Sequence, residues 1–240
     1  MIGGLIVTGL SNPLGPALTD LGQLLNPFAG TANELKVVAL GPDTDITDGY
    51  IVPDKTFDDV TPLPGPDSTD GYLYASPAEW KQWKNRVGAV SAGRHLLKLS
   101  LQGGSSKAVT IHGMDVTADC HDPVPGVHLV YPGAGGLPSR HFRIILDEPG
   151  GPTVTPYGKT GEERPDPEPA QFPFYVSESE LEYFVLDVQV RSRSCTWRAT
   201  LHWNVDGRQG TTEIGDDSTA FRVTAPTAAT SRHHLNGTRL

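Results

Sequence analysis

The sequence is short of cysteine, of methionine and of positive charge. Its 240 residues include two Cys and two Met, and 19 Lys and Arg stand against 28 Asp and Glu, so the net charge is −9. A surface of this sign repels the phosphate backbone of nucleic acids and the head groups of an anionic bilayer. We therefore expect no nucleic-acid partner, and contact with a membrane only through an N-terminal anchor.

A hydrophobic run long enough to cross a membrane is missing as well. The run from Ile2 to Leu10 has nine residues, whereas a spanning helix needs about 20, and no basic residues precede it as in a signal peptide. Two interpretations of residues 1–33 stay open. In the first, this apolar N-terminal segment begins inside a truncated membrane anchor or export segment. In the second, the run is a short buried element, followed by a helix whose apolar stripe comprises Leu14, Ala17, Leu18, Leu21, Leu24 and Leu25.

Glycine and proline, by contrast, are abundant. The 27 Gly and 21 Pro make up a fifth of the chain, which favours many turns and long loops over long helices. Two stretches rich in these residues, 41–76 and 147–173, are predicted to be long loops over the surface. Residues 226–240 are predicted to form a polar, weakly structured tail.

One short helix is predicted over 76–88, "SPAEWKQWKNRVG". Ser76 can cap it, Pro77 suits its first position, and Glu79 completes a capping box. Trp80 and Trp83 fall on one helical face. An aromatic binding platform would give the same spacing, but core packing is its commoner cause, so we expect both indoles to dock the helix onto a sheet.

From residue 94 onward, apolar side chains recur at every second position. In "CTWRATLHWNVDG" the odd positions from Cys195 to Val205 are apolar and the even ones are polar, which predicts a half-buried strand ending in an Asp-Gly turn, with Trp197 and Trp203 in the core. The phase of the alternation changes at Gly113, where a β-bulge is expected. Several such strands between turn signals predict a mainly β fold, an antiparallel β-sandwich of the Ig-like kind, over residues 34–225.

The two cysteines, Cys120 and Cys195, both fall on inward-facing strand positions. In sandwiches of this kind an inter-sheet disulfide beside a buried Trp is common, and Trp197 lies two residues from Cys195 on the same face. We therefore predict a Cys120–Cys195 disulfide, which places the domain in an oxidising compartment. The alternative is a pair of reduced cysteines packed as small hydrophobic side chains.

The chain also resembles a group of actinobacterial extracytoplasmic domains of unknown function. The resemblance covers about 77–225 and is carried by "EWKQW", "AVTIHGMDV", "RHFRIILD", "FPFYVSESE" and "CTWRATLHWNVDGRQGTTEI" leading to "AFRVT". Such domains are β-rich exterior parts of proteins with a single membrane helix. The resemblance therefore implies a membrane-anchored domain outside the cytoplasm, and it implies no active site.

Two stretches contain clusters of residue types that bind metals. In "CHDPVPGVH", Cys120 and His121 alternate across a strand and cannot easily face one ion, so no zinc site is expected. The acidic stretch 43–54 offers calcium ligands, but its spacing departs by one residue from the helix–loop–helix calcium loop. The candidate calcium ligands are Asp43, Asp45, Asp48 and Asp54. We expect no resident metal and no cofactor, and a solvated acidic loop is the alternative interpretation.

These patterns favour a non-catalytic, extracytoplasmic binding or interaction domain that uses its long loops to contact a protein or glycan outside the cell. One alternative is a carbohydrate-active or cell-wall hydrolase whose carboxylates come from 41–76 and 147–173. It would require a concave pocket with two perturbed carboxylates. Another is a structural subunit of a larger assembly, which would expose a large apolar patch.

Overall fold

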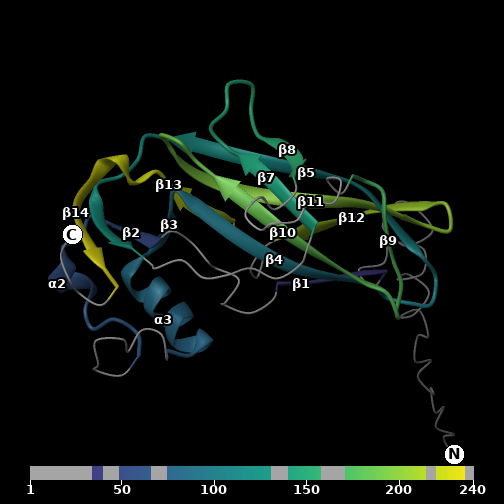
Figure 1. The fold of residues 1–240 in the computed structure, drawn as a ribbon, viewed down its shortest axis with the longest axis horizontal. Coiled ribbons are helices and arrows are strands. Elements are labelled where there is room, and N and C mark those ends of the chain that lie inside the picture. Colours follow the sequence, from purple (N-terminus) through teal and green to yellow (C-terminus); the bar gives the residue numbers. More distant parts are fainter. Residues whose placement is uncertain are drawn as a thin grey trace, which may run out of the picture.

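A computed structural model describes residues 34–39, 49–65, 75–130, 140–157, 171–214 and 220–235. Within these ranges the protein consists of two β-sheets and two α-helices (Figure 1). The prediction of a mainly β fold with two packed sheets is therefore confirmed. The apolar N-terminal segment 1–33, with its predicted anchor or helix, lies outside the described residues.

The smaller sheet, sheet A, has five strands. In spatial order they are β1 (Leu35–Ala39), β4 (Arg94–Gly103), β10 (Leu181–Gln189), β7 (Arg140–Ile145) and β8 (Thr153–Tyr157). The central strands alternate as the sequence indicated, since Leu97, Leu99 and Leu101 of β4 are buried while the residues between them are half-exposed. One face of sheet A thus supplies half of the main core.

The larger sheet, sheet B, has nine strands. Its main path runs through β14 (Ala229–His234), β6 (Gly126–Val130), β2 (Gly49–Pro53), β3 (Val90–Ala92), β13 (Phe221–Thr224), β11 (Ser194–Val205), β5 (Val109–His121) and β9 (Phe174–Val176), and β12 (Arg208–Ile214) pairs with β11. The inward side chains of β11 and β5 pack against those of sheet A in one continuous core. Trp197 and Trp203 are its largest fully buried members.

The strand directions differ from the antiparallel prediction at three places. Strand β7 runs parallel to β10, β3 parallel to β13, and β14 parallel to β6. The remaining pairings in the described ranges are antiparallel. Alternation of apolar side chains shows which face of a strand is buried but carries no information on the direction of its neighbour.

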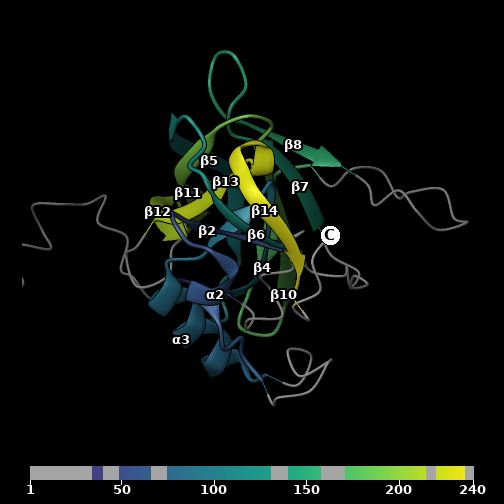
Figure 2. The same cartoon turned by 90° about the vertical axis from the view of Figure 1, so that its left-hand side faces the viewer.

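A second, smaller core lies at one end of sheet B, where α2 (Phe57–Val60) and α3 (Pro77–Val87) cover β2 and β6 (Figure 2). The α3 helix begins as predicted, since the Glu79 carboxylate accepts the Ser76 N–H at 2.6 Å. Trp83 is buried and its Nε1 donates to the Val60 carbonyl at 2.9 Å. Trp80 is only partly buried and stacks on Tyr50. Both indoles therefore join α3 to β2 and α2.

Three of the predicted irregular regions contain regular structure. The predicted loop 41–76 includes β2 and α2, and the predicted loop 147–173 includes β8. The predicted polar tail 226–240 includes a 3₁₀ turn, Pro226–Ala228, and β14, and Leu235 is 1% exposed in the second core. The sequences of these elements are rich in glycine, proline and polar residues, which are typical of loops. Strand β14 in particular is stabilised by pairing with its neighbour rather than by an apolar face, so its sequence has no strand pattern.

His128 in the second core gives a prediction on pH. It lies on β6 between Ile51 of β2 and Arg232 of β14, and it is 7% exposed with no hydrogen-bond partner at Nε2. Burial, aided by the Arg232 charge, lowers the pKa of His128 to about 4. The imidazole is therefore neutral in the fold at pH 7, whereas in the unfolded chain it takes up a proton near its ordinary pKa of about 6.5.

The stability contributed by neutral His128 is fully present above pH 6.5 and is lost as the pH falls from there to 4, because only the unfolded chain binds a proton in this window. We expect the free energy of unfolding to fall by about 2 kcal/mol over this range, a figure that allows for partial solvent screening. Urea unfolding of wild type and His128→Leu at pH 7 and pH 4.5 measures it. Equal losses in the two proteins would contradict the prediction.

Candidate functional site

The disulfide is confirmed, but it lies within one sheet rather than between two. Cys120 of β5 and Cys195 of β11 are directly opposite each other on neighbouring antiparallel strands, with Cα atoms 4.1 Å apart. This spacing is that of a non-hydrogen-bonded cross-strand pair. The prediction that the side chains of Cys120 and Cys195 both point inward is confirmed. The prediction that they join two sheets is wrong, because the sequence does not show which strands are neighbours. The bridge therefore ties together two strands that are already paired.

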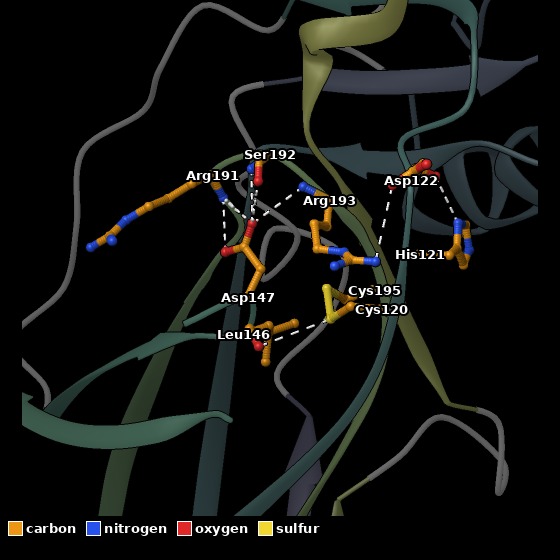
Figure 3. Close-up of a disulfide and its surroundings, with 9 residues drawn as sticks. All are labelled: Cys120, His121, Asp122, Leu146, Asp147, Arg191, Ser192, Arg193 and Cys195. Carbon is orange, nitrogen blue, oxygen red and sulfur yellow. Dashed lines mark hydrogen bonds and ion pairs between the residues drawn. A yellow bond between two sulfur atoms is a disulfide. The ribbon is translucent and has the colours of Figure 1, made fainter. Parts of the chain in front are cut away.

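The disulfide adjoins a turn that connects the two sheets (Figure 3). The Asp147 carboxylate, at the end of β7, accepts the backbone N–H groups of Arg191, Ser192 and Arg193 at 2.8–3.2 Å. Burial raises the pKa of Asp147, but these three N–H groups together outweigh it and lower the pKa. The ionised carboxylate thus pins sheet A to the turn between β10 and β11.

Two further carboxylates of the predicted loops, those of Asp59 and Glu148, also contact neighbouring parts of the fold. Asp59 accepts the backbone N–H of Thr56 at 2.9 Å and caps α2, which lowers its pKa. Glu148 pairs with the Arg191 guanidinium at 2.8 Å. At Asp59, Glu79 and Asp147 the net shift of the carboxyl pKa is downward, because each carboxylate accepts hydrogen bonds. The hydrolase interpretation gains no support from these residues.

Of the four calcium candidates, only Asp54 lies in the described residues. It follows β2 in a left-handed conformation with φ of 54°, and its backbone N–H donates to the Pro125 carbonyl. Asp43, Asp45 and Asp48 lie outside the described residues, so the calcium site stays a prediction. Across the described ranges, no three or more His, Cys, Asp or Glu side chains are arranged to hold a metal ion.

Polar side chains cover the outer side of sheet B over β9, β5, β11 and β12, here called the polar face. Its side chains are the outward-pointing members of the alternating strands, whose other members fill the core. They line up in cross-strand rows given by the pairing register. The polar face comprises Thr110, His112, Asp115, Thr117, Tyr175, Arg198, Thr200, His202, Asn204, Gln209, Thr211 and Glu213.

Charges on the polar face are paired across strands. The Arg198 guanidinium lies 2.7 Å from the Glu213 carboxylate, and His202 Nε2 lies 2.7 Å from Asp115 Oδ2. Between these pairs stand the hydroxyl groups of Thr117 and Thr200. The centre of the face therefore presents many hydrogen-bonding groups, and the Arg198–Glu213 pair within it carries no net charge.

The β-bulge predicted at Gly113 lies in the middle of the polar face. The register between β5 and β11 shifts between His202 and Trp203, so that His112 is left without a cross-strand partner. The extra residue turns the His112 ring toward His202, with ring centres 6.1 Å apart. Bulges often re-aim side chains at functional sites. Sequence spacing indicated the bulge but not this pair of histidines, because their contact depends on which strand lies next to β5.

Large apolar side chains are exposed at few described positions. Tyr175, 59% exposed, stands at the β9 edge of the polar face. Val38 and Tyr183 flank Ser100 on the outer side of sheet A, with Leu181 nearby. The structural-subunit interpretation thus has only this small group of side chains in its favour.

Within the described residues, no helix combines the length and the apolar character needed to cross a membrane.

Comparisons with known proteins do not identify a family for this chain. Comparison with protein-family models gives no match, and no curated protein matches the sequence. The functional conclusion therefore rests on the residues of the chain itself.

Proposed function

We propose that this protein is a non-catalytic, extracytoplasmic binding domain, that its contact surface is the polar face, and that its ligand is an uncharged glycan. The observation that carries the proposal is the polar face itself. It holds hydroxyl, amide and imidazole groups in register on strands whose opposite side chains face the main core. A rigid sheet of this kind fixes the positions of its donors and acceptors, which lowers the entropy lost on binding.

The composition of the polar face favours a glycan over a protein ligand. The centre of a protein interface is usually apolar and rich in aromatic side chains. Here the centre is polar, and the exposed Tyr175 ring lies at the edge, beside Thr110. Ion pairing of Arg198 with Glu213 leaves little charge to attract an anionic polymer. Hydroxyl-rich ligands match such a surface because each hydroxyl both donates and accepts.

The disulfide supports the location. Disulfides persist in oxidising compartments and are rare in the cytosol, and Cys120 and Cys195 leave no free cysteine in the chain. A membrane anchor within residues 1–33 belongs to the same proposal, as the resemblance to actinobacterial exterior domains implies.

Binding to isolated cell-wall polysaccharide tests the ligand. Thr200→Arg places a long cation at the centre of the polar face, and we expect it to weaken co-sedimentation with the polysaccharide about tenfold or more. Thr155→Arg is the matched control, since Thr155 is exposed on the outer side of sheet A. Equal binding by the two variants, or no binding by wild type, would overturn the polar face as a glycan site. Binding lost after protease treatment of the wall material would indicate a protein ligand instead.

Thiol counting tests the location. Protein taken from its native host under alkylating conditions, then denatured without reductant, should label at no cysteine and should yield a peptide that links Cys120 to Cys195. Full labelling of both cysteines would overturn the extracytoplasmic placement, because the cytosol keeps thiols reduced.

A further inference from the structure

The bulge in β5 places two imidazoles side by side on an exposed surface. His112 is exposed and the side chain of His202 is 32% exposed, and their ring centres lie 6.1 Å apart with planes inclined by 32°. Two imidazole nitrogens bound to one zinc ion at about 2.1 Å set the ring centres about 5 to 6 Å apart. The observed separation of the two ring centres is therefore close to the separation that a shared ion requires.

Asp115 supplies the support that a metal-binding histidine usually has. Its Oδ2 lies 2.7 Å from His202 Nε2. Histidine ligands commonly donate one ring N–H to a carboxylate, which fixes the ring and makes the other nitrogen a better ligand. Because Asp115 contacts Nε2 of His202, Nδ1 is the nitrogen of this ring that would bind the ion.

We propose that His112 and His202 form a binding site for a divalent transition metal ion of the zinc class, with Asp115 as its positioning residue. Neutral imidazole suits Zn²⁺ and its neighbours, whereas Mg²⁺ prefers oxygen ligands. Among the described residues, the ligands of this site are the two imidazoles of His112 and His202. The remaining positions are open to water or to a donor atom of a bound molecule. This site departs from the expectation of no resident metal, and such an open ion exchanges readily.

The site adjoins the surface proposed for glycan binding but does not depend on it. A tetrahedral ion with two protein ligands keeps two positions for outside donors, and Thr200 and Thr211 are cross-strand neighbours of Asp115 and His202. Metal binding is measured without glycan, so its failure would leave the glycan proposal standing, and failure of glycan binding would leave the metal site standing.

Titration with Zn²⁺ tests the proposal, by calorimetry and by the ¹⁵N resonances of the histidine rings. We expect saturable binding that shifts the His112 and His202 resonances together. His112→Asn and His202→Asn should each weaken binding about tenfold or more, and Asp115→Asn should weaken it about tenfold by loosening His202. His121→Asn is the matched control, since His121 is an exposed histidine at the end of the same strand. Mg²⁺ should give no shift.

Two results would overturn the site. Binding that both His→Asn variants retain would place the ion elsewhere, for example on His233 and His234. Loss in only one of the two variants would mean a single-histidine contact rather than a shared ion. The far-ultraviolet circular dichroism and thermal midpoint of each variant must match wild type, and a variant that fails this check is replaced by the corresponding Gln.

Discussion

Replacing Cys120 and Cys195 together by alanine is expected to lower the free energy of unfolding by about 4 kcal/mol. The two residues are 75 positions apart in sequence, and a cross-link that closes a loop of this length removes about that much conformational freedom from the unfolded chain. For a protein of this size the thermal midpoint should fall by about 10 °C. Thermal unfolding of the double variant, beside wild type, gives both quantities.

The double variant is preferred to single ones because a single substitution leaves a reactive thiol. Wild type unfolded with reductant present is the matched control, and its midpoint should approach that of the double variant. Cys195 is 1% exposed, so its truncation adds a small packing loss that reduction alone does not cause. A change below about 1 kcal/mol in the double variant would contradict this loop-closure account.

Local patterns predicted the faces of the long strands and the features within them. Alternation placed Trp197 and Trp203 inward, the change of phase at Gly113 gave the bulge, and Asp206-Gly207 gave the hairpin turn, where both residues have positive φ. Each of these follows from side-chain direction and backbone sterics over a few residues. Such information is present in the sequence because it does not depend on distant partners.

Features that depend on distant partners were not predictable. The parallel pairing of β7 with β10 and the position of Cys120 directly opposite Cys195 are decided by strand order. Strand β14 lacks an alternating apolar face, so its sequence resembles a tail. The contact between His112 and His202 could not be predicted for the same reason. The two residues are 90 positions apart in the sequence, and only the pairing of β5 with β11 brings them together.

The second large effect is expected at Trp197. Its ring is 1% exposed, stacks on Phe221 at 4.8 Å between ring centres, and meets the edge of His95 from sheet A. Trp197→Ala should cost about 4 kcal/mol, because the indole area is lost from the core and the two sheets cannot close the space. Denaturant unfolding of the variant measures this cost.

The Trp197→Phe variant separates the contribution of ring packing to stability from the contribution of an indole hydrogen bond. The buried Nε1 of Trp197 has no hydrogen-bond partner, so phenylalanine removes volume and an unsatisfied donor together, and the cost should stay below about 2 kcal/mol. Trp203 offers the matched comparison, because its Nε1 donates to Thr212 Oγ1 at 2.9 Å.

Trp203→Phe should therefore cost about 1 kcal/mol more than Trp197→Phe. That difference should disappear when Thr212 is also changed to Val, because the double variant removes both partners of the bond. An equal cost for the two Trp→Phe changes in the presence of Thr212 would contradict the prediction. It would mean that packing of the Trp203 ring, and not its hydrogen bond to Thr212, accounts for the stability lost in Trp203→Phe. This packing is close, because the ring lies against Gly210 on β12 and leaves no room for a side chain there.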